Sequence, residues 1–145
     1  MKSIKVLSIK EPHASLLLTP YKTIETRSWA TKYRGEIYLH ASSSKSMPPY
    51  NTDTKPMYDR VLKLYDKYEE EHGKKLGARF STIYAKATLV DCIEMTPENI
   101  AALPQEEIDA GYYNPGRYMW VLKDVTPIDP IPAKGHLGIW HYEIN

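Results

Sequence analysis

The chain has 145 residues but a single cysteine, Cys92, and only seven glycines. One cysteine excludes an intramolecular disulfide and a cysteine-based metal cage, and its scarcity predicts a reducing, cytoplasmic location. The glycines are scattered, so no glycine-rich loop of the usual nucleoside triphosphate or dinucleotide folds is present. The spacing of His13, His72, His136 and His141 matches no metal-binding motif. We therefore expect neither a metal ion nor a cofactor.

Long hydrophobic runs are also absent. No apolar stretch approaches the roughly 20 residues that a membrane-spanning helix requires. The basic N-terminus is followed by apolar positions that Ser8, Lys10 and Glu11 interrupt, so it does not resemble a secretory signal. The sequence predicts no association with a membrane. Its length predicts one domain over residues 1–145, large enough to bury a core without metals or disulfides.

The formal net charge of +1 hides an uneven distribution along the chain. Residues 1–52 carry eight basic and three acidic side chains, whereas residues 81–145 carry four basic and nine acidic ones. If folding preserves this separation, the N-terminal part would form a positive patch that attracts phosphates. If folding interleaves the two segments, the patch disappears. The near-neutral total argues against tight, sequence-independent binding to duplex nucleic acid.

Hydrophobic periodicity and turn residues predict an α+β domain. Strands are expected at 3–9, 24–29, 35–41, 81–93, 118–125 and 137–144. Helices are expected at 14–18, at 57–72 with Gly73 as the stop, and from Pro97 to about Leu103 with Thr96 as the cap. Residues 42–56 are expected to form a long loop, and the proline-rich segment 126–132 to be extended and away from the sheet centre. Five or six strands with two or three helices favour a curled or closed sheet whose ends are plugged by helices.

Three charged residues in the second predicted strand region are the first candidates for function. Lys22, Glu25 and Arg27 lie within six residues, and in an extended strand Glu25 and Arg27 point to the same face. Because strands disfavour Glu and a buried charge is costly without a partner, this pattern favours the wall of a polar pocket. The alternative is an exposed Glu25–Arg27 ion pair of little energetic value.

Aromatic residues form a second candidate. The segment from Tyr112 to Trp120 contains four rings and Arg117 within nine residues, a composition suited to stacking on nucleic-acid bases. Core residues with polar tips that reach the surface are the alternative for most of these rings. In extended strands Tyr118 shares a face with Trp120, and Trp140 with Tyr142. At least one of these pairs should lie inside the protein.

His40 is followed by Ser42, Ser43 and Ser44, which are ingredients of nucleophilic catalysis. However, the sequence contains no Gly-x-Ser-x-Gly motif that would place a serine on a sharp turn. The pattern therefore favours a hydrogen-bonded histidine at the end of a strand over a catalytic one.

Taken together, several segments resemble the ASCH domain of the PUA-like superfamily. The resemblance covers nearly the whole chain and rests on Ser8–Ser15, Lys22–Arg27 (Lys-x-x-Glu-x-Arg), Arg34–Gly35, His40–Ser42, Gly116–Trp120 and Gly135–Trp140. It implies a small PUA-like β-barrel of five to six mostly antiparallel strands with two to three flanking helices. It also implies a cleft lined by the Lys-x-x-Glu-x-Arg segment and an association with RNA, modified bases or nucleotides.

Departures from the family pattern bear on activity. Pro20 stands where the family usually has Gly, and His13 replaces a more common Trp or Tyr. Some ASCH-like proteins are amidohydrolases that act on acetylated cytidine through a Lys and a Thr three residues later. Here Lys22 matches the Lys, but Glu25 occupies the Thr position. Other members are described as ribonucleases, for which Lys22, Arg27 and His40 could position phosphate and transfer a proton.

The leading hypothesis is a module that binds RNA, another single-stranded nucleic acid or a modified nucleotide. Its expected ligand-binding residues are Lys22, Glu25, Arg27, Trp29, Arg34, His40, Ser42 and Arg117. In this hypothesis Lys22, Arg27 and Arg34 contact phosphates or base edges, and Glu25 accepts from a donor. Trp29 or an aromatic residue from 112 to 120 stacks on a base. A hydrolase in the same cleft, with Lys22 and Glu25 as catalytic residues, is the alternative. A protein-interaction domain is the third possibility.

Overall fold

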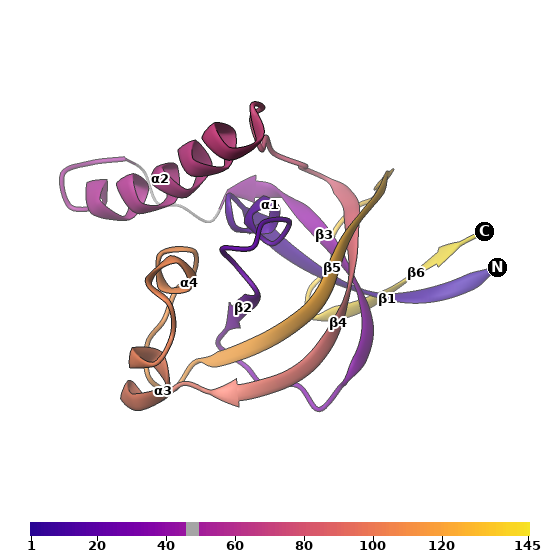
Figure 1. Ribbon diagram of the computed structural model, residues 1–145. Coiled ribbons are helices and arrows are strands. Elements are labelled where there is room, and N and C mark those ends of the chain that lie inside the picture. Colours follow the sequence, from indigo (N-terminus) through magenta and orange to yellow (C-terminus); the bar gives the residue numbers. More distant parts are fainter. Residues whose placement is uncertain (46–49) are drawn as a thin grey trace.

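The computed structural model describes residues 1–45 and 50–145. Its strands form one mixed, six-stranded sheet in the order β2-β5-β4-β3-β1-β6. The strands are β1 (Lys2–Glu11), β2 (Ile24–Arg27), β3 (Gly35–Lys45), β4 (Thr82–Glu94), β5 (Tyr118–Pro132) and β6 (Ile139–Ile144). β1 and β3 are parallel, and the other neighbours are antiparallel. The predicted α+β class is confirmed, although the sheet curls without closing into a barrel, so that β2 and β6 are its edges (Figure 1).

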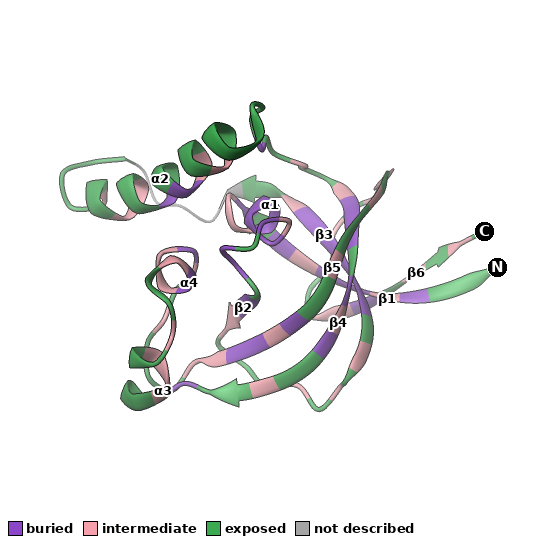
Figure 2. Ribbon diagram, viewed as in Figure 1, coloured by how far each residue is buried: buried purple, intermediate pink, exposed green. Residues whose placement is uncertain are grey.

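Four helices accompany the sheet in the described residues: α1 (His13–Leu16), α2 (Lys55–His72), α3 (Pro97–Ala101) and α4 (Gln105–Asp109). α2 ends where Gly73 adopts a left-handed conformation, as its predicted stop signal requires. Most of α2 faces solvent, and Val61 and Leu64 supply its buried positions (Figure 2). No helix in the described part of the chain is long and apolar enough to cross a membrane.

Apolar side chains are buried on both faces of the central strands. On β1, Leu7 and Ile9 belong to the main core beneath α1, whereas Ile4 and Val6 pack with Trp140 of β6 in a second cluster. Since side chains alternate along a strand, β1 has to be apolar on both faces to serve both clusters. Curling of the sheet therefore encloses two cores.

Both tryptophans of the predicted aromatic pairs are buried. Trp120 is fully buried in the main core, and Trp140 is buried in the second cluster. Their strand neighbours Tyr118 and Tyr142 are only partly buried at the margins of the same clusters. The prediction that at least one pair faces inward is therefore confirmed for the tryptophans of both.

Two predicted segments differ from the structure. The loop expected at 42–56 is wrong at its two ends, because β3 continues to Lys45, which pairs with Glu11 of β1, and because α2 already begins at Lys55. Residues 50–54 contain no helix or strand, as expected of a loop. Residues 46–49 of that loop lie outside the described residues. The helix expected from Pro97 to Leu103 is two short helices, since Pro104 follows α3 and α4 begins at Gln105. The capping role of Thr96 is confirmed: its side chain accepts from the Asn99 backbone N–H.

The proline-rich segment 126–132 is extended, as predicted, and forms the second half of β5. β2 pairs only with residues 118–121 of β5, so the second half has β4 on one side and no described strand on the other. Pro127, Pro130 and Pro132 therefore stand where a missing N–H group costs little.

A buried carboxylate connects α4 to the residues before β2. The Thr23 backbone N–H donates to both oxygens of Glu107 at 2.9 and 3.1 Å, and the Thr23 hydroxyl donates at 2.6 Å. Glu107 is 5% exposed whereas Thr23 is exposed, so these bonds are partly shielded from water. Hydrogen bonds to a charged group are stronger than neutral ones, and this contact holds α4 against the strand that carries Glu25.

We predict that Glu107→Ala lowers the free energy of unfolding by about 1.5–3 kcal/mol, the typical contribution of hydrogen bonds to a charged group, since the N–H and hydroxyl of Thr23 lose their charged acceptor. The matched control is Glu106→Ala on the same helix. Glu106 is exposed and pairs with the exposed Lys67, so its loss should be much smaller. Urea denaturation measures both, and equal losses in the two variants would contradict the prediction.

Candidate functional site

The described residues enclose a large, open cleft of about 1970 Å³. One wall contains β2, the segment that follows α4, and Arg117 just before β5. The lining also includes the second half of β1, the segment between β5 and β6, and residues of α2 and α4. Segments far apart in the sequence thus meet in one concave surface.

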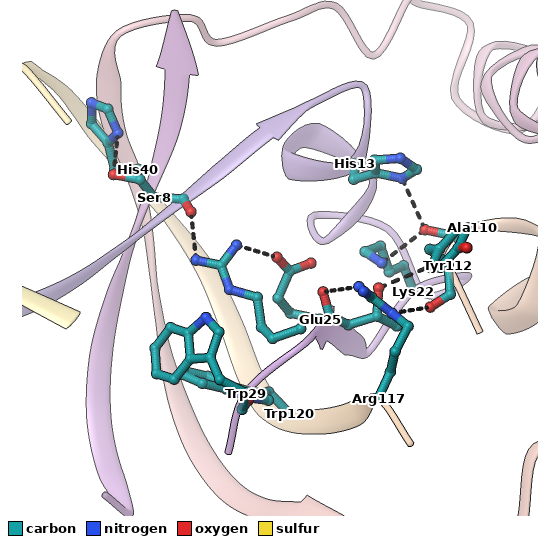
Figure 3. Close-up of polar contacts among 12 residues, drawn as sticks. Ser8, His13, Lys22, Glu25, Trp29, His40, Ala110, Tyr112, Arg117 and Trp120 are labelled. Atoms are coloured by element: carbon teal, nitrogen blue, oxygen red, sulfur yellow. Dashed lines mark hydrogen bonds and ion pairs between the residues drawn. The ribbon is translucent and has the colours of Figure 1, made fainter. Parts of the chain in front are cut away.

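Glu25 and Arg27 of β2 lie together in this cleft, as their spacing predicts. Arg27 Nη1 donates to Glu25 Oε2 at 3.2 Å, and Arg27 Nη2 donates to the Ser8 carbonyl of β1 at 3.1 Å (Figure 3). The side chains of Arg27 and Glu25 are only 21% and 7% exposed. The ion pair is therefore largely buried rather than on an exposed sheet face, and it connects β2 to β1 across the cleft.

Trp29 also lines the cleft and keeps 38% of its surface exposed. Its ring meets the buried Trp120 edge to face, with centroids 4.7 Å apart, and Trp120 Nε1 donates to the Trp29 carbonyl at 3.1 Å. The Arg27 guanidinium lies 5.8 Å from the Trp29 ring centroid. The solvent-facing ring of Trp29 is thus held in place by the buried Trp120 and lies beside the Arg27 cation.

A second exposed ring lies in the segment after α4. Tyr112 is 57% exposed, and the Arg117 guanidinium lies 4.6 Å from its ring centroid. Arg117 Nε donates to the Tyr112 carbonyl at 3.2 Å, and the Tyr112 N–H donates to the Thr26 hydroxyl at 3.3 Å. The cleft therefore contains two pairs of an aromatic ring and an arginine, Trp29 with Arg27 and Tyr112 with Arg117 (Figure 3).

Lys22 occupies a different position from that expected of a ligand-contacting residue. Its side chain is 1% exposed, does not line the cleft, and donates from Nζ to the Ala110 carbonyl at 2.8 Å (Figure 3). Burial lowers the pKa of the Lys22 ammonium, while the charges of Glu25 and Glu107 oppose that shift. Lys22 thus lies behind the wall formed by Gly111, adjacent to the cleft but not open to it.

His13 shares the same carbonyl acceptor. Its Nδ1 lies 3.1 Å from the Ala110 oxygen, and because a carbonyl only accepts, Nδ1 carries the hydrogen. Burial lowers the His13 pKa to about 4, and the charge of Lys22 adds to this effect. His13 is therefore a neutral imidazole at the cleft wall, with Nδ1 engaged by the backbone.

Gly111 permits the close packing of this wall. A Cβ atom at Gly111 would lie 2.8 Å from the Tyr113 ring and 3.2 Å from the Thr26 methyl group. Such distances are too short for a side chain, so the position favours glycine.

His40, which precedes the three serines considered for catalysis, belongs to a chain of hydrogen bonds that lies entirely within the protein. His40 Nε2 lies 2.8 Å from the Ala133 carbonyl, so it donates, and Nδ1 accepts from the Ser8 hydroxyl at 3.0 Å. Trp140 Nε1 donates to the same hydroxyl at 3.0 Å. His40 is 1% exposed, and burial lowers its pKa. Both ring nitrogens are satisfied within the protein, as the hydrogen-bonded interpretation requires.

Other expected ligand-binding residues are distributed unevenly. Ser42 and Arg117 line the cleft, whereas Arg34 does not. Arg34 instead donates to the carbonyls of Thr31 and Tyr33 and lies 3.7 Å from Asp91. The structure therefore brings together Glu25, Arg27, Trp29, Ser42 and Arg117, with His40 buried in the wall, and leaves Arg34 on another surface.

The cleft has an excess of basic groups among the described residues. Five basic side chains and two acidic ones line it. The basic residues are Lys10, Arg27, Arg60, Arg117 and Lys134, and the acidic residues are Glu25 and Asp109. Both acidic groups are already paired, Glu25 with Arg27 and Asp109 with Arg60 at 3.7 Å. Folding thus interleaves the N- and C-terminal segments, yet the cleft retains positive charge. Within residues 1–45 and 50–145, no group of three or more His, Cys, Asp or Glu side chains could hold a metal ion.

The family model of the ASCH domain matches residues 7–132. The chain belongs to the ASCH domain family. This ASCH domain is 26% identical over 140 residues to human activating signal cointegrator 1, in an alignment that covers 92% of the chain and 21% of the human protein. The mouse protein of the same name gives the same identity and coverage. The chain therefore spans about a fifth of the length of these curated relatives.

Several residues of this cleft escaped the sequence analysis as ligand-contact candidates. Lys10 and Lys134 are isolated lysines at strand ends, with no local signal of function. Tyr112, in contrast, is one of the aromatic residues that the sequence offers for stacking, although its position beside Arg117 follows only from the turn between them. His13 was visible as a departure from the family pattern, which was the available sign that it borders the cleft.

We predict that the His13 imidazole titrates near pH 4 in the folded protein, well below its ordinary value of 6.5. Between these values the unfolded chain binds more protons, so the free energy of unfolding is highest above pH 6.5 and declines as the pH falls toward 4. NMR titration of the His13 ring measures the pKa directly. In His13→Phe the decline measured by urea denaturation should be shallower, and a His13 midpoint near 6.5 would contradict the prediction.

Proposed function

We propose that this ASCH domain binds single-stranded RNA in the cleft, with one base stacked on Trp29 and another on Tyr112. The observation that carries the proposal is the pair of exposed rings, each beside an arginine, in one concave and mainly basic surface. Every base has a face that can stack on an aromatic ring, and arginine adds attraction to phosphate and ring alike. The family's association with RNA and modified nucleotides supports the same assignment.

Polar groups of the cleft offer further contacts to a base. Glu25 can accept from an exocyclic amine, and Arg27, which is itself fixed by its bond to the Ser8 carbonyl of β1, holds that carboxylate in place. The Tyr113 hydroxyl is buried and has no hydrogen-bond partner in the described residues, and burial raises its pKa. A buried polar atom without a partner is unusual.

The hydrolase alternative has less support. The Lys22 amine is buried and engaged by the Ala110 carbonyl, and Glu25 replaces the threonine that acetylcytidine hydrolysis uses in related proteins. Incubation of the protein with acetylcytidine and with RNA tests this alternative. Turnover that Lys22→Ala abolishes would establish an enzyme in place of a binding module.

We predict that Trp29→Ala and Tyr112→Ala each weaken binding of a short fluorescein-labelled oligouridylate by roughly 5- to 150-fold, the value of one base stacked on one ring. Fluorescence anisotropy measures the dissociation constants. Trp29→Phe, which keeps a ring, should retain most of the affinity and guards against a general loss of folding.

The matched controls lie outside the cleft. Tyr50 is 63% exposed and Arg34 is exposed, and neither lines the cleft, so Tyr50→Ala and Arg34→Ala should bind as the wild type does. Wild-type affinity in both Trp29→Ala and Tyr112→Ala would refute the proposed function.

A further inference from the structure

One rim of the cleft is built where four strands reach the same level of the sheet. In the strand pairing, Ile9 of β1 lies opposite Ala41 of β3, Ala41 lies opposite Thr82 of β4, and Thr82 lies opposite Pro132 of β5. One residue beyond this row lie Lys10, Ser42 and Ser81, and two residues beyond it lie Ser43 and Lys134; all five line the cleft. We call these five residues the cleft rim.

The side chains of the cleft rim suit a phosphate backbone. Its five members comprise two lysines and three serines with no carboxylate, and all except the half-buried Ser42 are exposed. Within residues 1–45 and 50–145, neither Lys10 nor Lys134 forms an ion pair. Lysine ammonium and serine hydroxyl groups are common phosphate contacts, and they fix the position of a nucleic acid without reading its sequence.

Backbone contacts hold the rim together. The Ser81 N–H donates to the Ala41 carbonyl at 2.7 Å, and the Ala133 N–H donates to the Ser81 carbonyl at 3.1 Å. Ser81 has a φ of 61°, a left-handed conformation that is uncommon for residues other than glycine. The segments that carry Ser42, Ser81 and Lys134 are therefore tied to one another by main-chain bonds.

The length of the rim distinguishes between ligands. Neighbouring strands lie about 4.8 Å apart, so the three intervals from β1 to β5 span about 14 Å along the sheet. A stacked strand has one phosphate per roughly 3.4 Å of helix axis, and the phosphates themselves lie further apart because they wind around that axis, so this length accommodates several nucleotides and at most about four. A mononucleotide would leave most of the rim unused.

We propose that the cleft rim binds the phosphodiester backbone of the RNA strand whose bases stack on Trp29 and Tyr112. The ligand is then a single strand of several nucleotides, not a free nucleotide or modified nucleoside. This inference rests on the proposed function, because the stacking residues and the rim belong to the same cleft. It adds a second contact surface, in which Lys10 and Lys134 provide the charge.

The test compares Lys10→Gln/Lys134→Gln with Lys86→Gln/Lys123→Gln, which removes the same charge from exposed positions outside the cleft. Anisotropy titrations use a dinucleotide and a longer oligouridylate over a range of salt concentrations. For the longer strand, loss of two phosphate contacts should reduce the salt slope by about 1.4, at roughly 0.7 per contact. The tighter binding of the longer strand over the dinucleotide should disappear in the rim variant and persist in the control.

The outcomes separate the two proposals. A rim variant that keeps the wild-type salt slope and length dependence, while Trp29→Ala still weakens binding, overturns the rim but leaves the proposed function intact. Equal loss in the rim variant and the control also overturns it, because the effect would then reflect net charge alone. Dinucleotide binding that is insensitive to both Trp29→Ala and Tyr112→Ala overturns the proposed function. Absence of RNA binding by the wild type overturns both.

Discussion

The carbonyl oxygen of Ala110 holds the cleft wall together. It accepts from the Lys22 ammonium and from the His13 imidazole, and so joins α1, the start of the β2 region and the end of α4 at one buried atom. The nearby bonds between Glu107 and Thr23 fix α4 in the same place. Tyr112 follows two residues after Ala110, so the exposed ring inherits its position from this buried junction.

The buried positive charge at this junction has negative partners inside the protein, whereas the cleft surface keeps an excess of positive charge. The buried Lys22 lies among the carboxylates of Glu25 and Glu107, whose charges favour its ammonium form against the cost of burial. Glu25 in turn anchors Arg27, which reaches across to the Ser8 carbonyl. The Lys-x-x-Glu-x-Arg segment is therefore as much a structural element as a chemical one: Lys22 supports the wall from behind, while Glu25 and Arg27 form its front.

Local pattern was sufficient for much of the fold. Alternation located β1, and helical spacing with Gly73 located α2, because these elements bury one or two regular faces. The position of the Lys22 amine could not be read in this way, since its acceptor lies 88 residues further along the chain. Nor could the sequence show that Lys10 and Lys134 belong to one surface, because their relative position depends on the register of four strands. The extent of β3 was missed because its serines resemble those of a loop.

The uncovered half of β5 has a consequence for how this molecule behaves in a crowded solution. An open sheet margin normally offers a row of amide donors onto which another chain can add and start aggregation. Along this margin Pro127, Pro130 and Pro132 withhold such donors at three places in six residues. Because of these prolines, the edge is a poor template for pairing with a strand of another molecule. The sheet can therefore remain open without exposing an edge along which every residue can pair.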